Sequence, residues 1–325
     1  MVRTMNLALV LVIVALLSGP RAAEAQQAGK LPRIGFLMAR LDSPHEKAFR
    51  EGLRELGYLE GQNIVIDYRS TDGRDDAAPA LMAELVRVPV DIIVTWTTPA
   101  ALAAMRATNR IPIVAMTGDP VASGLAASLS RPGGNVTGVS ILTDELDAKQ
   151  LDLLRETVPG IRRVAVLSNP ANPVWAAGFK KLETRASSLG LSLQLLEVTS
   201  ARELEGAFAT AARERAGALL VLRDNLFATH RRQLVELAAR HRLPAMYGSR
   251  FDVEAGGLIA YEVDIRRMMR RLAAYVDRIL RGAKPAELPI EQPTTFDFVI
   301  NLKTAKALGL TIPPSVLTRV DEVIQ

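Results

Sequence analysis

The sequence from Leu31 to Tyr247 contains one pattern of alternating apolar strands and amphipathic helices twice. Equivalent positions lie at a nearly constant separation: 130 residues between Ile34 and Val164, and 127 residues between Ile92 and Leu219. Such self-similarity indicates an internal duplication, here of a βαβαβαβ unit. Strands that alternate with helices favour parallel sheets covered by helices on both faces. The sequence therefore predicts an α/β protein with two Rossmann-like lobes.

The predicted elements follow the same order in both halves. The first helix starts with a capping box, in which Ser43 is the N-cap, Pro44 the first helical residue and Glu46 the third. Strands are predicted over 33–38, 63–68, 91–95 and 111–116, and again over 163–167, 191–198, 218–222 and 243–247. Helices are predicted over 43–57, 77–86, 100–109, 174–190, 203–213 and 227–241.

Further elements follow the second unit and must return to the two lobes. They are a strand over 257–262, a helix over 265–281, a strand over 296–301, a short helix over 304–308 and a helical tail over 316–324. We expect the chain to cross to the first lobe and back again. The predicted lobes comprise 31–143 plus 252–290, and 144–251 plus 291–325, with a cleft between them. Hinge motion is expected at crossovers near 140–145, 248–252 and 289–296.

Residues 1–25 have the features of a secretory signal peptide. Arg3 precedes an 11-residue apolar run over 7–17, and the small residues of Ala23-Glu24-Ala25 predict cleavage before Gln26. The apolar run is shorter than the roughly 20 residues of a membrane-spanning helix. An uncleaved N-terminal anchor is the alternative. Export by the Sec route into a periplasm is predicted.

The composition excludes several classes of function. The chain has no cysteine and three histidines, and it lacks GxGxxG, a P-loop, GxSxG and HExxH. No catalytic residue, metal site or cofactor is therefore predicted. Removing the signal peptide leaves 38 Lys and Arg against 34 Asp and Glu, a net charge of +4. The one dense basic run, within 266–271, has the spacing of a solvated helix face, and no nucleic-acid partner is expected.

Polar residues follow many of the predicted strands. Ligands of open α/β sheets bind outside the carboxyl ends of the strands, where helix N-termini suit a carboxylate. Asp224 could pair with an ammonium group, and Trp96 could pack over a ring. For each residue the alternative is a helix cap or a turn; Asp224, for example, could cap a helix that begins near Phe227. The candidate ligand-binding residues are Ser43, Trp96, Thr97, Thr98, Asp119, Ser140, Asn169, Asn172, Asp224, Asn225, Tyr247, Ser249 and Tyr261.

Two specific segments resemble a known family. The sequences PGGNVTGV at 132–139 and VINLKTAKALGL at 299–310 are similar to those of ABC-transporter substrate-binding proteins of the TrpX-like group, and softer similarity covers the mature chain. The resemblance implies a type I periplasmic-binding-protein fold, with three crossovers between lobes that close on a small ligand. It also implies aromatic amino acids, tryptophan especially, as ligands of some members. Asp224-Asn225 matches the family's aspartate–asparagine pair, whereas the loop over 39–45 differs from tryptophan-type members.

The leading functional hypothesis is an exported receptor that captures a small molecule, an amino acid or a related compound. It would act as a monomer and deliver its ligand to the permease subunits of an ABC importer. An exported hydrolase-type enzyme on a two-lobed scaffold is the alternative. A cytosolic ligand-sensing regulator shares the fold, but residues 1–30 cannot supply a DNA-binding segment.

Overall fold

The computed structural model describes residues 31–325, except for residues 142 and 173. The predicted signal peptide lies outside the described residues. Within the described part, no helix is both long and apolar enough to cross a membrane.

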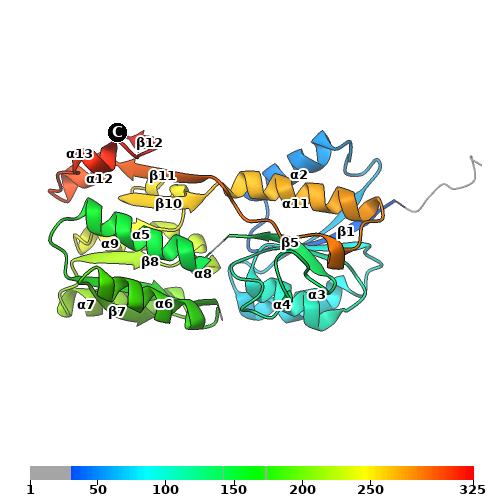
Figure 1. The fold of residues 1–325 in the computed structure, drawn as a ribbon, viewed down its shortest axis with the longest axis horizontal. Helices are drawn as coiled ribbons and strands as arrows, with labels where there is room; N and C mark the ends of the chain where they lie inside the picture. Colours follow the sequence, from blue (N-terminus) through cyan, green and yellow to red (C-terminus); the bar gives the residue numbers. More distant parts are fainter. Residues whose placement is uncertain (1–30, 142, 173) are drawn as a thin grey trace, which may run out of the picture. The chain divides into compact units, whose positions relative to one another are not determined.

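Lobe 1 is built on a five-stranded parallel sheet with the order β2-β1-β3-β4-β5. These elements are coloured blue to green in Figure 1. Its strands are β1 (Arg33–Met38), β2 (Val65–Ser70), β3 (Ile92–Thr95), β4 (Ile113–Thr117) and β5 (Val136–Ser140). Its first helical elements are α2 (Pro44–Glu55), η1 (Asp75–Ala77), α3 (Ala78–Leu85) and α4 (Thr98–Ala107).

One helix from late in the sequence completes lobe 1. Helix α11 (Ile265–Leu280) packs against α2, and its apolar face shares a core with β1 and β3. Gly52 of α2 permits the close approach. A Cβ atom at this position would lie 2.9 Å from Cα of Arg270 and 3.0 Å from Cβ of Ala273. A larger side chain at 52 would therefore push the two helices apart.

Lobe 2 is built on a seven-stranded sheet with the order β12-β11-β10-β9-β8-β6-β7. Its strands are β6 (Arg163–Ser168), β7 (Ser192–Glu197), β8 (Ala218–Val221), β9 (Ala245–Tyr247), β10 (Ile259–Val263), β11 (Phe296–Asn301) and β12 (Glu322–Ile324). Its helical elements are α5 (Thr143–Thr157), α6 (Val174–Ser188), η2 (Ala201–Glu203), α7 (Leu204–Arg213), α8 (Asn225–Thr229), α9 (Arg231–Arg240), α10 (Arg250–Glu254), α12 (Leu302–Ala307) and α13 (Pro314–Leu317).

The strand pairing corrects the predicted second crossover. Strand β10 pairs with β9 through Ile259 and Met246, so residues 259–263 belong to lobe 2 and not to lobe 1. The chain leaves lobe 2 after β10 and enters α11, then returns through η3 (Pro285–Glu287) to β11. Because β10 leads out of lobe 2 and β11 leads back in, this pair is antiparallel. The apolar sequence of β10 fits either sheet, so it did not reveal the crossover.

Two further predictions about helices are wrong. The helix predicted over 227–241 is two helices, α8 and α9, which meet at His230. The tail predicted as a helix consists of the short α13 and then β12, which pairs with Val299–Asn301 of β11. The end of the tail is a strand because the edge of the sheet at β11 offers it a hydrogen-bonding partner. Local helix propensity does not anticipate such a partner.

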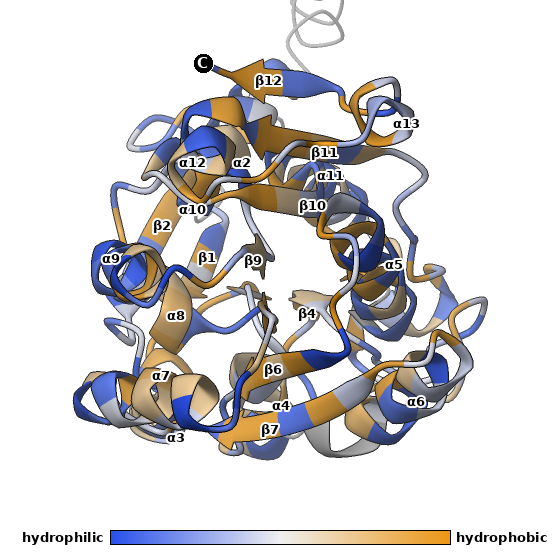
Figure 2. Ribbon diagram, turned by 90° about the vertical axis from the view of Figure 1, so that its left-hand side faces the viewer, coloured by the Kyte–Doolittle hydropathy of each residue, from blue (hydrophilic) through white to orange (hydrophobic). Residues whose placement is uncertain are grey.

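The cores lie on both faces of each sheet, as expected for α/β lobes. In lobe 2, Val164 and Val166 of β6 face one cluster, whereas Ala165 and Leu167 face the other. In Figure 2, strands β6 and β10 are largely hydrophobic, while the outer side of α9 is hydrophilic. The predicted α/β fold of two lobes is confirmed.

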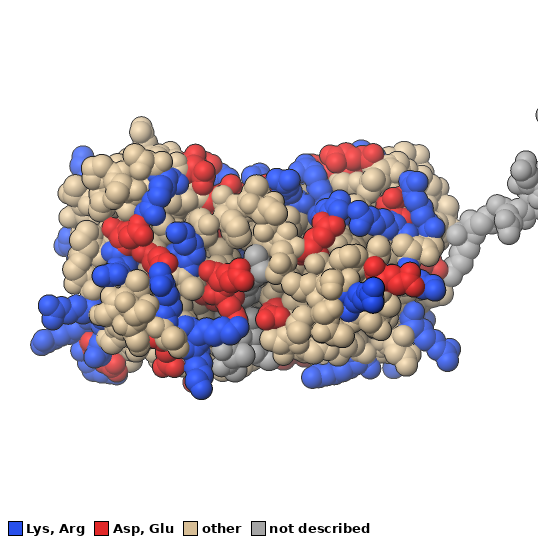
Figure 3. Space-filling view, in the orientation of Figure 1, with Lys and Arg blue, Asp and Glu red and all other residues tan. Residues whose placement is uncertain are grey.

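Charges on the surface are mixed. On the face drawn in Figure 3, basic and acidic side chains are interspersed over both lobes. Within the basic run of α11, Arg270 forms an ion pair with Glu51, and Arg271 forms one with Glu291. The run is therefore neutralised in part by acidic neighbours, as a solvated helix face would be.

Candidate functional site

A pocket lies where the carboxyl ends of strands from both sheets meet. It holds roughly 720 Å³ of space, including its opening to solvent. Lobe 1 contributes His45, Asp75, Trp96, Thr97, Thr98, Met116, Thr117, Gly118, Ile141 and Ile265. Lobe 2 contributes Asn172, Arg223, Asp224, Asn225, Ala228, Arg231 and Ser249.

Asp224 lies in a dense network of hydrogen-bond donors. It follows β8, is buried, and caps α8 by accepting a 2.9 Å hydrogen bond from the backbone N–H of Leu226. Its carboxylate also accepts hydrogen bonds from the side-chain amides of Asn169 at 3.0 Å and Asn172 at 3.1 Å. Donors of this kind favour the ionised form of a carboxyl group. The network fixes a negative charge at the wall of the pocket.

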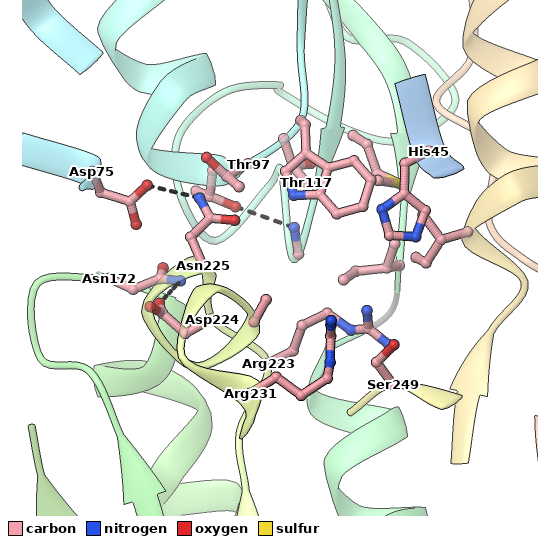
Figure 4. A pocket seen from close by; sticks show the side chains of 17 residues that line it. His45, Asp75, Thr97, Thr117, Asn172, Arg223, Asp224, Asn225, Arg231 and Ser249 are labelled. Carbon is pink, nitrogen blue, oxygen red and sulfur yellow. Dashed lines mark hydrogen bonds between the residues drawn. The ribbon is translucent and has the colours of Figure 1, made fainter. Parts of the chain in front are cut away.

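Asn225 links the two lobes at this point. Its Nδ2 donates to Oδ1 of Asp75, which begins η1 in lobe 1, at 2.9 Å. Figure 4 shows Asp75 and Asn225 joined in this way, close to Asp224 and Asn172. Burial, and after it the negative charge of Asp224, raises the pKa of Asp75 to about 6.

Two arginines lie on another side of the pocket. Figure 4 places Arg223 and Arg231 beside Ser249 and away from Asp75. Nε of Arg231 donates to the buried Asp252 at 2.8 Å. Arg223 donates to the carbonyl of Gly248 and lies 3.5 Å from Oε2 of Glu262.

These guanidinium groups retain donor capacity. Within the described ranges, Nε of Arg223 is buried without a hydrogen-bond partner. Among the same residues, the hydrogen bond to Asp252 engages only one of the three side-chain nitrogens of Arg231. Five N–H groups in a fixed fork suit a planar carboxylate. Arg231 can therefore offer donors to an anion, whereas the unpartnered Nε of Arg223 is itself buried.

The remaining wall is aromatic and apolar. The rings of His45 and Trp96 lie 4.3 Å apart between centroids, and the ring of Phe251 from lobe 2 lies 5.5 Å from His45. Burial and the positive charges of Arg223, Arg231 and Arg266 lower the pKa of His45 to about 3. His45 is consequently a neutral ring at physiological pH. Beside it, Met116, Ile141 and Ile265 also line the pocket.

The two threonines after β3 are already engaged within lobe 1. The hydroxyl of Thr97 accepts from the N–H of Ala100 and caps α4, and the hydroxyl of Thr98 accepts from the N–H of Gly118. Residue 99 is proline and has no N–H. The N-terminus of α4 therefore has few N–H groups left for a ligand.

The structure brings together seven of the thirteen candidate residues. The lining includes Trp96, Thr97, Thr98, Asn172, Asp224, Asn225 and Ser249. Asn169 is not part of the lining, but its side-chain amide donates a hydrogen bond to Asp224.

The other five do not line this pocket. Ser43 caps α2, and Asp119 caps the turn at 121–122. Ser140 donates to the carbonyl of Gly118, Tyr247 is fully buried in the core of lobe 2, and Tyr261 stacks on Phe296. Their types suit caps and cores as well as ligands, and only the fold separates these roles.

Four important lining residues were not among the candidates. Arg223 stands directly before Asp224, and His45 lies in the loop after β1, so their positions at strand ends were a usable signal. Arg231 is in the first turn of a helix and Asp75 follows β2 in a short turn. Nothing local distinguishes these two from ordinary surface charges.

Known proteins share this architecture. The transcription regulator CcpA of Lactococcus lactis is 9% identical, with a TM-score of 0.58 over 83% of this chain and 97% of that one, which shows the likeness of fold alone. The crystal structure of an ABC domain in complex with L-Trp from Streptococcus pneumoniae is 28% identical, with a TM-score of 0.84 over 91% of this chain and 100% of that one.

Comparison of the sequence points to the same group. The tyrosine-binding protein of Clostridioides difficile (strain R20291) is 26% identical over 268 residues, covering 82% of this chain and 76% of that protein. The family model described as "ABC transporter substrate binding protein" matches residues 42–324, nearly all of the described chain. The predicted receptor function is confirmed over the enzyme alternative: the chain belongs to the family of ABC transporter substrate-binding proteins.

Proposed function

We propose that this receptor binds an α-amino acid with an aromatic or large apolar side chain. The observation that carries the proposal is the division of the pocket into an acidic side, a basic side and an apolar wall. An α-amino acid presents an ammonium, a carboxylate and a side chain in the same way. The two relatives whose names include tyrosine and L-Trp support this class of ligand.

Asp224 is the proposed acceptor for the ammonium group. An unpaired charge inside a closed pocket costs several kcal/mol, so the ammonium requires a carboxylate partner. Asn169 and Asn172 hold the Asp224 carboxylate in place through hydrogen bonds. The ligand therefore meets a preorganised charge, which lowers the cost of ordering on binding.

The carboxylate of the ligand is proposed to bind Arg223 and Arg231. Both guanidinium groups line the pocket and have donors that the described residues do not use. The side chain would then lie against Trp96, Met116 and Ile265. Burial of apolar surface there stabilises the complex by about 25 cal/mol per Å².

The test is Asp224→Asn, which keeps the shape of the side chain and its ability to cap α8. Titration calorimetry with L-tryptophan and L-tyrosine should show affinity reduced by tens- to thousands-fold, or about 2–5 kcal/mol. Asp119→Asn is the matched control, because Asp119 caps a turn outside this pocket. Parental affinity in Asp224→Asn would refute the assignment.

We propose further that the protein is exported to the periplasm by the Sec route, cleaved before Gln26, and delivers its ligand as a monomer to permease subunits in the inner membrane. The sequence of residues 1–25 and the family support this proposal. Intact-mass measurement of the exported protein checks the cleavage site. A mass equal to that of the full chain would contradict it.

A further inference from the structure

Asp75 is the one acidic residue that lobe 1 contributes to the described lining of the pocket. It lies at the start of η1, just after β2, and is half-buried. The hydrogen bond from Asn225 occupies Oδ1, and it is the only hydrogen bond to this carboxylate among the described residues. Oδ2 remains able to accept from a ligand.

A second carboxylate, that of Asp224 in lobe 2, lies on the same side of the pocket (Figure 4). Asn225, which donates to Asp75, directly follows Asp224 in the sequence, so one short segment of lobe 2 carries both the carboxylate and the amide near Asp75. The charge of Asp224 is felt at Asp75 strongly enough to contribute to its raised pKa. Asp224 already accepts at least three hydrogen bonds, which leaves it little capacity for a group with three donors.

We propose that Asp75 is a second acceptor for the ligand's ammonium group, so that a primary ammonium shared by Asp75 and Asp224 favours contact between the lobes. This inference rests on the proposed function, because it presupposes an ammonium at Asp224. A primary ammonium has three N–H donors, enough for both carboxylates and one amide oxygen. A quaternary ammonium has none, so the site selects primary amines.

Contact between the lobes depends on whether the negative charges of Asp75 and Asp224 are compensated. Around the pair, Thr229 of lobe 2 packs so closely on Gly73 of lobe 1 that an added Cβ would lie 2.4 Å from its hydroxyl oxygen. Two ionised carboxylates at this junction repel each other, and either a cation or a proton relieves the repulsion. The other charged groups are Arg74 and Asp76 on the same turn, which pair with each other at 3.8 Å, and Arg223 and Arg231 on the other side of the pocket. The side chain of Asp76 is 81% exposed, so solvent screens it.

Calorimetry with L-tryptophan at pH 8 and pH 5 tests the inference on the full mature protein. In the parent, affinity should fall about tenfold at pH 5, because protonation of a group with a pKa near 6 leaves about a tenth of it ionised. Asp75→Asn should bind about 10- to 100-fold more weakly at pH 8 and lose most of this pH dependence. Asp76→Asn, the neighbouring exposed carboxylate, should behave like the parent.

The trimethylated analogue Nα,Nα,Nα-trimethyl-L-tryptophan isolates the role of the N–H donors. It keeps the ring, the carboxylate and the positive charge, and it should bind at least 100-fold more weakly than L-tryptophan to the parent. In Asp75→Asn the difference between the two probes should shrink. An Asp75→Asn variant with parental affinity at both pH values overturns the inference, while a loss of binding in Asp224→Asn alone leaves the proposed function intact.

Failure of L-tryptophan to bind would count against the proposed function. In that case, small-angle scattering of the ligand-free protein still tests the role of Asp75. The parent should be more compact at pH 5 than at pH 8, because protonation of Asp75 removes the repulsion from Asp224. Asp75→Asn should show no such change. The same pH response in both proteins overturns the role of Asp75.

Discussion

The two walls of the pocket come from duplicated halves of the chain and yet differ in chemistry. Lobe 1 supplies all of the large apolar residues of the lining, Trp96, Met116, Ile141 and Ile265. Lobe 2 supplies both of its arginines and the Asp224 carboxylate with its amide donors. One wall can bury a side chain, and the other can orient charged groups.

The difference arises in equivalent loops. Strand β3 of lobe 1 and strand β8 of lobe 2 are the third strands of their units, and each leads into a helix capped by a side chain. Thr97 caps α4, and Asp224 caps α8. Trp96 precedes the first cap, and Arg223 precedes the second. Both halves thus keep a helix cap at this position, while the residue before the cap is apolar in lobe 1 and charged in lobe 2.

Specialisation has a structural consequence for lobe 2. The charges at its wall need buried partners, Asp252 for Arg231 and Glu262 for Arg223. Burying such a carboxylate costs desolvation free energy, and removing the arginine that pairs with it leaves an unpaired buried charge that destabilises the fold. Lobe 1 has apolar neighbours at the corresponding wall. Substitutions of the charged lining residues of lobe 2 should therefore change stability and affinity together, and those of the apolar lining residues of lobe 1 mainly affinity.

The largest expected effect is from Arg231→Gln. It leaves Asp252 buried without its cation, which should lower the free energy of unfolding by about 3 kcal/mol at pH 8. Because burial raises the pKa of Asp252, protonation of this carboxyl becomes easier as the pH falls, and the loss should be smaller at pH 5 than at pH 8. Urea unfolding measures both values. Arg240→Gln is the control on the same helix, since Arg240 and Glu205 are each 60% exposed; equal losses in the two variants would contradict the argument.

Glu262→Gln should change how stability depends on pH. Burial raises the pKa of Glu262 from 4.5 to about 7, although the charge of Arg223 opposes the rise. The folded state then binds more protons than the unfolded state between these values, so the free energy of unfolding falls as pH rises from about 4.5 to 7. The effect is roughly 3 kcal/mol at most.

Thermal or urea unfolding across that pH range should give a flatter profile for Glu262→Gln than for the parent. Glu205→Gln, an exposed substitution in the same lobe, should keep the parental slope. If Glu262→Gln also keeps the parental slope, Glu262 is not the source of this pH dependence of stability.

Trp96→Ala tests the apolar wall of lobe 1. Loss of this ring should weaken L-tryptophan binding by about 2 kcal/mol, or roughly 30-fold, with a smaller change in unfolding because Trp96 is only half-buried. Trp96→Phe should recover most of the affinity. If calorimetry finds unchanged affinity in Trp96→Ala, the ring of Trp96 does not contact the ligand.

Ser43→Ala gives the smallest expected effect and separates a cap from a ligand contact. The hydroxyl of Ser43 accepts a 3.2 Å hydrogen bond from the N–H of Glu46, so its loss should cost about 1 kcal/mol of stability. Affinity for L-tryptophan should stay at the parental value. A clear fall in affinity would return Ser43 to the binding site.

Local sequence determined the elements of this protein and their order. Apolar periodicity, the capping box at Ser43 and the repeat between Ile34 and Val164 are contained in short segments, and they led to two α/β lobes. Polar residues at strand ends likewise led to Asp224 and Trp96, because parallel strands bring their carboxyl ends to one edge.

Only the tertiary structure decided how the halves share residues. It placed β10 in lobe 2, because an apolar strand can join either sheet until its partner is known. It buried Tyr247 in a core and brought Asp75, 149 positions before Asp224 in the sequence, to the same pocket. Contacts between residues far apart in the chain depend on how the lobes pack, and no local pattern of residues encodes them.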